Sequence, residues 1–241
     1  ANGSASTQTI TITINDALIA TVVLPSTELT TGKSSSFTPV SASQGTTPYT
    51  FTISPALPSG LSLTSSTGLI SGTPTTASTL TSYAITVTDA NGSTATQSVS
   101  ITVNPAISFT TDGGNSPTTL IATTGTTKTA TYSVTGGTGT KSFSVTSSPA
   151  NAGIEINTSS GLLTIGSSVA NNTYTLTVTA TDTNGATATR TVNLTVNIAV
   201  TAVVSVPMIS LIRTQSVNVV PVSGLGGSGA LTYAVSPALP N

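Results

Sequence analysis

The sequence predicts an all-β protein made of tandem β-sandwich repeats of about 90 residues, stacked end to end. Three observations lead to this prediction: segments that recur with that period, short stretches in which apolar residues alternate with threonine, and Asn- and Gly-containing turns between the stretches. A period of this length fits one β-sandwich domain. No helical periodicity of useful length competes with it.

The repeat is seen in three independent comparisons within the chain. The first compares ANGSASTQTITITI at 1–14, ANGSTATQSVSITV at 90–103 and TNGATATRTVNLTV at 183–196. The second compares GLSLTSSTGLIS at 60–71 with GIEINTSSGLLT at 153–164, and the third FTISPALPS at 51–59 with YAVSPALPN at 233–241. The copies are offset by 89 or 93 residues, or by the sum of the two, so one period explains them all.

Alternating segments supply the expected strands. In ITVTD at 85–89 and LTVTATD at 176–182, apolar residues alternate with threonine, as expected where one face of a strand packs inward and the other meets water. The branched side chains of Thr, Val and Ile also suit a pleated sheet. The predicted strands are Gln8–Ile14, Thr50–Ser54, Ala84–Thr88, Ser98–Val103, Thr175–Thr179 and Thr191–Val196.

Turns are predicted where Asp, Asn and Gly cluster between these segments. TDANG at 88–92 and TDTNG at 181–185 favour tight hairpins, because Asn and Gly accept the positive φ that such turns need. TGGTG at 135–139 and GLGGSG at 224–229 are further turn signals. Neither ends in the Gly-Lys-Ser/Thr of a phosphate-binding loop.

The repeat divides the chain into four parts. These are the last strand of a preceding repeat (1–15), a repeat at 16–104, a diverged repeat at 105–197, and the front part of a further repeat (198–241). The junctions Asn104-Pro105 and Asn197-Ile198 leave almost no linker, which favours end-to-end stacking into a stiff rod. Two interpretations of the outer parts stay open: the chain is a window onto a longer array, or neighbouring identical chains complete them through strand donation.

The composition excludes several classes of function. The 241 residues include 54 Thr and 36 Ser but no His, Cys or Trp. The commonest ligands of zinc, haem, copper and iron–sulfur sites are therefore missing, as is the imidazole of Ser-His-Asp and Cys-His catalytic groups. Five basic residues and a net charge of −1 argue against nucleic-acid binding. No apolar stretch reaches the roughly 18 residues of a membrane span.

Residues 57–74, LPSGLSLTSSTGLISGTP, and 83–92, YAITVTDANG, resemble the bacterial immunoglobulin-like, cadherin-like repeats of large surface adhesins. The following repeat keeps Gly161-Leu162 and Thr181-Asp182 of this signature, but it has Ile165-Gly166-Ser167 where the family has Gly-Thr-Pro. The resemblance implies an immunoglobulin-like sandwich for each repeat.

For function, the resemblance implies the setting of that family, outside the cell and at its surface. We expect a non-enzymatic structural stalk or filament module of an extracellular adhesin, which presents a binding tip away from the cell. Its partners would be neighbouring repeats of the same or identical chains, and a cell-surface or glycan ligand would bind at a tip outside this chain. The alternatives are a phage or virion fibre or decoration protein, and an accessory module of a secreted glycan-active enzyme.

The carboxylates are the remaining candidates for a site. Asp89 and Asp182 occupy the same place in the two repeats, and Asp16 and Glu28 lie near the first junction. Cadherin-like domains often hold Ca²⁺ between modules with clustered carboxylates, so the resemblance makes Asp16, Asp89 and Asp182 calcium candidates. The alternative for Asp89 and Asp182 is an Asx turn. Because Ca²⁺ takes six to eight oxygens and the six acids are dispersed, we expect no resident cofactor.

No catalytic residue is expected. A glycosidase would need two carboxylates about 5–10 Å apart in a cleft, one of them with a raised pKa. Regular sandwiches offer no obvious cleft for such a pair, and Asp112 and Glu155 have no recognisable motif around them.

Overall fold

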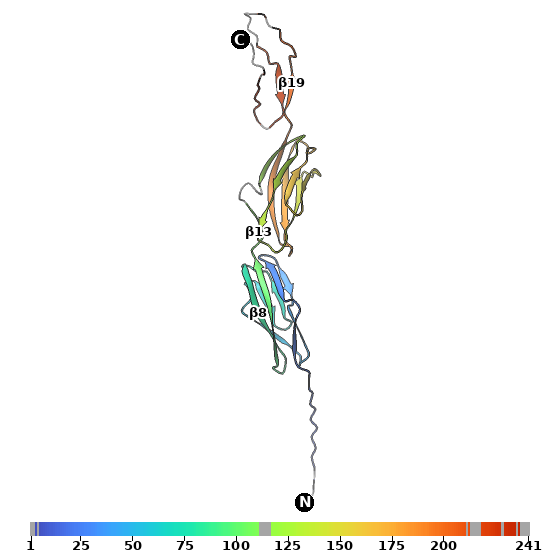
Figure 1. The fold of residues 1–241 in the computed structure, drawn as a ribbon. Helices are drawn as coiled ribbons and strands as arrows, with labels where there is room; N and C mark the ends of the chain where they lie inside the picture. Colours follow the sequence, from blue (N-terminus) through green and yellow to red (C-terminus); the bar gives the residue numbers. More distant parts are fainter. Residues whose placement is uncertain are drawn as a thin grey trace. The chain divides into compact units, whose positions relative to one another are not determined.

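A computed structural model describes residues 3, 5–110, 117–210, 212, 218–227, 229–234 and 236 (Figure 1). These residues form twenty β-strands and no helix, which confirms the predicted all-β class. The chain divides into two compact units, one mainly from residues 1–106 and the other mainly from residues 107–241. Each unit contains one complete sandwich, so the prediction of tandem sandwiches of about 90 residues is also confirmed.

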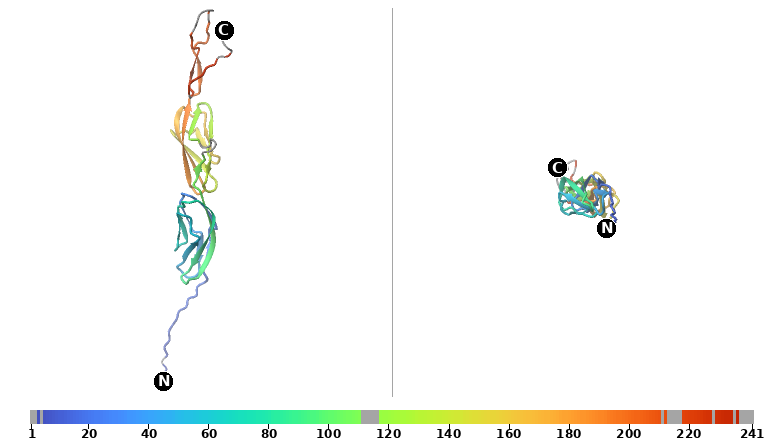
Figure 2. Two further views of the ribbon diagram at one scale, coloured as in Figure 1. Left: turned by 90° about the vertical axis from the view of Figure 1, so that its left-hand side faces the viewer. Right: turned by 90° about the horizontal axis from the view of Figure 1, so that it is seen from below.

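The first sandwich has nine strands. They are β1 (Ile19–Val22), β2 (Ser26–Thr30), β3 (Ser35–Phe37), β4 (Val40–Ser43), β5 (Thr50–Ser54), β6 (Leu61–Thr64), β7 (Leu69–Gly72), β8 (Ser78–Thr88) and β9 (Thr94–Asn104). One layer is a four-stranded sheet in the order β2-β9-β8-β5, and the other contains the sheet β3-β7-β6 and the pair β1-β4. Ile70 of β7 and Val99 of β9 belong to one buried cluster, so the two layers face each other across this core (Figure 2).

The second sandwich repeats this plan. Its strands are β10 (Ser108–Phe109), β11 (Thr119–Thr123), β12 (Lys128–Thr131), β13 (Val134–Thr135), β14 (Ser142–Ser148), β15 (Ile154–Ile156), β16 (Leu162–Ile165), β17 (Asn172–Thr181) and β18 (Thr187–Asn197). The four-stranded sheet has the order β11-β18-β17-β14, and the opposite layer contains β12-β16-β15 and β10-β13. The order of corresponding strands is therefore the same in both sandwiches.

The two long hairpins, β8–β9 and β17–β18, form the centre of each four-stranded sheet. The alternation predicted from the sequence appears directly in their burial. Along β9 the side chains of Val99, Ile101 and Val103 are buried while the threonines and serines between them point outward, and Val192, Leu194 and Val196 repeat the pattern along β18. The predicted strands between residues 50 and 196 are thus confirmed. The inward apolar stripe is what fixes the register of each hairpin.

The predicted strand Gln8–Ile14 is not formed in this structure, because these residues pair with no strand among those described. The side chains of Ile10, Ile12 and Ile14 are 82%, 79% and 91% exposed. The corresponding strand β9 is held between β8 and β2, so a segment with the same sequence pattern has neither hydrogen-bond partners nor a core here. Alternation of apolar and polar residues favours a strand, but the strand forms only where neighbouring strands provide hydrogen bonds and a core.

After the second sandwich the described residues form one two-stranded ladder. β19 (Thr201–Val204) pairs antiparallel with β20 (Val222–Leu225), which repeats the β1–β4 pairing of the first sandwich. Val203, Val204 and Leu225 are exposed, whereas Val40, which corresponds to Val222, is fully buried in the first sandwich. Part of the YAVSPALPN segment, including residues 237–241, lies outside the described residues.

Candidate functional site

An early strand and the last strand of each sandwich lie side by side and run in the same direction. In the first sandwich, β2 pairs parallel with β9 from Ser26↔Ser100 to Thr30↔Asn104. The bonds continue past both ends of β2, since the Ser100 N–H donates to the Pro25 carbonyl at 2.9 Å and the Thr31 N–H to the Asn104 carbonyl at 2.9 Å. The Thr31 hydroxyl donates to the same carbonyl at 3.0 Å, so two hydrogen bonds from Thr31 hold this end of the β2–β9 pair.

The second sandwich contains the same arrangement. β11 pairs parallel with β18 from Thr119↔Asn193 to Thr123↔Asn197, and the Thr124 N–H donates to the Asn197 carbonyl at 2.8 Å. Because the two paired strands point the same way, the chain enters each sandwich near one end and leaves it at the other. A pull on the entering and leaving segments therefore slides one strand along the other.

Asp89 follows β8 and organises the turn to β9. Its Oδ1 accepts from the N–H groups of Asn91 at 2.9 Å and Ser93 at 2.8 Å, and its Oδ2 accepts from the Thr46 N–H at 3.0 Å. The bond to Asn91 is the Asx turn that the sequence offered as one alternative. The bond to Thr46 crosses to a loop 43 residues earlier, so the buried carboxylate also ties two loops together.

The same bonds decide the charge state of Asp89. Burial of the side chain is the largest single influence and raises its pKa. The backbone N–H groups of Thr46, Ser93, Asn91 and Gly92 act in the opposite direction and together prevail, so the pKa of Asp89 lies below its ordinary value. Asp89 is therefore held as a carboxylate whose acceptor positions are used by backbone amides.

The loop at Gly45 brings Asp16 to the same end of the first sandwich. The Gly45 N–H donates to the Asp16 carbonyl at 2.9 Å, although the Asp16 side chain is exposed. Gly45 has a φ of +60°, and a Cβ at this position would lie 2.9 Å from Asp89 Oδ2. Glycine is thus required both by the backbone conformation and by the close approach of the carboxylate.

The other carboxylates lie elsewhere. Glu28 is opposite Thr102 in the β2·β9 register and accepts from Asn104 Nδ2 at 3.3 Å, at the end of the sandwich remote from Asp89. Asp182 is buried after β17 in the second sandwich. No three acidic side chains gather in the part of the chain that the structure describes. The expectation of no resident metal, with Asp16, Asp89 and Asp182 as the calcium candidates, stays a prediction.

The two acids considered for catalysis are not joined into a site by the described structure. Glu155 is exposed on β15, where its Cα partner is Thr164 of β16. Asp112 lies outside the described residues. No helix in the described part of the chain has the length and apolar character needed to cross a bilayer.

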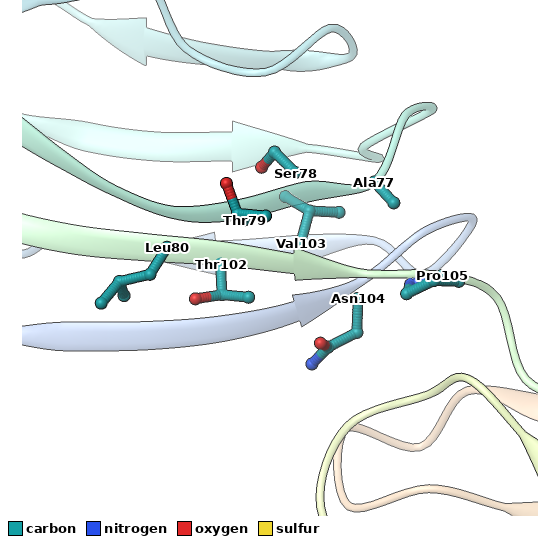
Figure 3. A pocket seen from close by; sticks show the side chains of 8 residues that line it. All are labelled: Ala77, Ser78, Thr79, Leu80, Thr102, Val103, Asn104 and Pro105. Atoms are coloured by element: carbon teal, nitrogen blue, oxygen red, sulfur yellow. The ribbon is translucent and has the colours of Figure 1, made fainter.

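A shallow apolar groove of about 460 Å³ lies where β8 begins and β9 ends (Figure 3). Its lining includes Leu80, Val103 and Pro105, and Val103 points to the opposite side of β9 from Thr102. The β8–β9 register shifts between Ser78 and Thr81, whereas β17 pairs with β18 without a shift. Sequence reasoning missed this bulge, because alternation remains clear only from Tyr83 onward.

A model of the family described as "Putative Ig domain" matches residues 11–104 and 105–197, which together exceed half of the chain. A search of curated proteins finds no match.

Several solved structures match this chain at low sequence identity. Immunoglobulin domains 1-4 of Sidekick-1 match with 15% identity and a TM-score of 0.43, over 76% of this chain and 49% of that chain. Extracellular domains 3-5 of Drosophila OTK match with 14% identity and a TM-score of 0.43, over 75% and 62%. Drosophila N-cadherin EC1-3 matches with 14% identity and a TM-score of 0.32, over 76% and 68%. The chain thus spans about half the length of the Sidekick-1 chain.

Proposed function

The chain belongs to this family of Ig domains over both of its complete sandwiches, and on that premise we propose that it is a non-enzymatic segment of the stalk of an extracellular, repetitive adhesin. The stalk holds a binding tip, carried outside these residues, away from the cell surface. Its task is mechanical: each sandwich transmits tension from its entering segment to its leaving segment without unfolding.

The parallel pairing of β2 with β9, repeated by β11 with β18, is the observation that carries this proposal. Tension along the chain loads such a pair in shear, so its interstrand hydrogen bonds resist together. If an antiparallel hairpin were pulled from its open end, its bonds would break one after another. The geometry therefore suits a domain that bears tension between its two ends.

A single-molecule pulling experiment on the 241-residue chain tests the proposal. We expect two unfolding steps, each releasing about 300 Å of chain, since one residue extends by roughly 3.3–3.6 Å. Thr31→Pro removes the N–H and the hydroxyl that both bind the Asn104 carbonyl. It should lower the force of one step and leave the other unchanged.

Thr124→Pro is the matched variant, because it removes the corresponding N–H bond to Asn197 in the second sandwich. Each variant should weaken only its own step. Thr31→Val removes the hydroxyl alone and serves if the proline variant fails to fold. Unfolding forces in folded Thr31→Pro and Thr124→Pro that equal those of the unchanged chain would contradict the proposal.

We also propose that residues 1–15 are the last strand of another repeat and residues 198–241 the front part of a further one, as segments of a longer array. The exposed side chains of Ile10, Ile12 and Ile14 support this, since they occupy the positions of the buried Val99, Ile101 and Val103. The mass of the natural polypeptide under denaturing conditions, with peptide mapping, tests it. A mass far above 23.7 kDa is expected, whereas a mass near 23.7 kDa would instead indicate a filament subunit completed by neighbouring chains.

A further inference from the structure

The second sandwich carries a polar groove of about 550 Å³ at the end where Asp182 lies. Three stretches line it: residues 140–142 at the start of β14, residues 158–159 between β15 and β16, and residues 181–183 at the end of β17. We call these residues the hydroxyl groove. Its volume falls within the range of about 300–1,000 Å³ that is usual for small-molecule sites.

The walls of the hydroxyl groove are held in place by backbone bonds. Ser142 faces Thr181 in the β14–β17 register, and the Phe143 N–H donates to the Thr158 carbonyl at 2.8 Å. Asn157 Oδ1 accepts from the Ser159 N–H at 3.1 Å, which forms an Asx turn. The backbone of the groove walls is therefore in place before any ligand arrives, which reduces the entropy cost of binding.

The lining consists of polar side chains throughout. It contains the hydroxyls of Thr140, Ser142, Thr158, Ser159, Thr181 and Thr183. The remaining two lining residues are Lys141 and the buried Asp182. Lys141 Nζ donates to the Gly139 carbonyl, and an ammonium group has two further N–H donors.

The first sandwich differs at the corresponding positions. Tyr49 stands where the second sandwich has Lys141, and Thr50 stands where it has Ser142, since Thr50 pairs with Thr88 as Ser142 pairs with the corresponding Thr181. The Tyr49 hydroxyl donates to the Gln44 carbonyl of its own loop. The cation of the groove is thus specific to the second sandwich, whereas both sandwiches have a hydroxyl side chain at the position of Ser142.

We propose that the hydroxyl groove binds a saccharide that carries a carboxylate, such as a uronic acid unit of an acidic polysaccharide. Hydroxyls suit the ring hydroxyls of a sugar as donors and acceptors. No aromatic side chain lines the groove, so a neutral sugar finds no ring to stack on and gains little affinity. A sugar acid adds a charge-assisted bond to Lys141.

NMR titration of the 241-residue chain tests the inference, with trigalacturonate as the probe and galactotriose as its neutral counterpart. Trigalacturonate should shift the amide signals of residues 140–142, 158–159 and 181–183, and galactotriose should shift them far less. Binding should weaken with added salt, because the contact with Lys141 is solvent-accessible. Lys141→Gln should weaken binding about tenfold, the usual scale of one hydrogen bond to a charged group.

Lys128→Gln is the matched control, since Lys128 is exposed on β12 and pairs with Ile165, at the end of β16 remote from residues 158–159. It removes the same charge and should leave binding unchanged. The inference is overturned by the absence of localised shifts at millimolar trigalacturonate, by equal responses to both trisaccharides, or by equal weakening in the two lysine variants. None of these results alters the unfolding forces, so the stalk proposal stands or falls separately.

Discussion

The two sandwiches share one topology and one inward pattern but build their polar and aromatic features differently. Val99, Ile101 and Val103 of the first correspond to Val192, Leu194 and Val196 of the second, and all six are buried. Corresponding strands also pair in the same order. The inward stripe and the strand order therefore define the sandwich, and the remaining positions are open to change.

What fills those positions differs between the two sandwiches. In the first, the buried carboxylate of Asp89 binds the backbone of Thr46 across the hairpin end. In the second, Tyr132 packs edge-to-face on Phe109, with ring centroids 6.2 Å apart, and the Arg190 guanidinium lies 5.3 Å from the centroid of the Phe109 ring. Asp182 is buried at the place that corresponds to Asp89, so the difference described here lies in the aromatic contacts around Phe109 of the second sandwich.

The largest effect should come from the inward stripe itself. Ile101→Ala removes a side chain that is 1% exposed, so it should cost about 2–5 kcal/mol of the stability of the first sandwich. Ile12→Ala changes the corresponding residue of the segment that has no sandwich, where the side chain is 79% exposed. It should leave the stability unchanged. Denaturant unfolding measures the change in stability caused by each variant. Amide hydrogen exchange then shows which sandwich the change affects.

The two segments that contain Ile12 and Ile101 also show how far the sequence predicts the fold. The segments TITITI at 9–14 and SVSITV at 98–103 have the same alternation, yet only the second forms a strand. Local pattern states which face of a strand will turn inward. Whether the segment pairs with a sheet depends on residues far away in sequence. The local pattern contains no information about those residues.

The functional features were predictable to different degrees. Asp-x-Asn-Gly predicts the turn at Asp89 because the Asx bond is local, but the bond to Thr46 depends on a loop 43 residues away. The parallel β2·β9 pair gave no signal, since STELT at 26–30 does not alternate clearly. The hydroxyl groove could have been suspected only by aligning Lys141 with Tyr49. Long-range pairings are set by the assembled sheets and not by neighbours in sequence.

Asp89→Asn should have the next largest effect. The amide keeps one acceptor oxygen but turns an NH₂ group towards a backbone N–H, so the first sandwich should melt several degrees lower. Because the pKa of Asp89 is lowered in the folded state, its contribution is present above the ordinary Asp value and is lost as the pH falls through the folded value. The acid destabilisation of the first sandwich should therefore shrink in the variant. Asp16→Asn, at an exposed carboxylate, should not reproduce the change; an equal effect would contradict the role of the backbone N–H groups that bind Asp89.

A smaller effect is expected at Tyr132 in the second sandwich. Its hydroxyl donates to the Pro117 carbonyl at 3.0 Å, so Tyr132→Phe should cost about 1 kcal/mol. Burial raises the pKa of Tyr132 to about 12, against a lowering by Arg190. The unfolded chain ionises near pH 10 and the folded chain does not, so stability should fall between pH 10 and 12. Thermal melts across this range should lose part of that slope in Tyr132→Phe, and an unchanged slope would rule out the assignment.

The smallest effect is expected from metal removal, and it decides whether the carboxylates serve calcium or the turns. A ligand that binds only the folded state at a hundredfold excess over its Kd adds about 2.7 kcal/mol, which a melting experiment detects easily. Both oxygens of Asp89 already accept backbone N–H groups, and Asp182, the corresponding residue, belongs to the other sandwich. Melts in EDTA and in millimolar calcium should therefore coincide. If calcium raises the melting temperature and Asp89→Asn or Asp182→Asn abolishes the rise, these carboxylates bind the ion and the two sandwiches share a metal-dependent function.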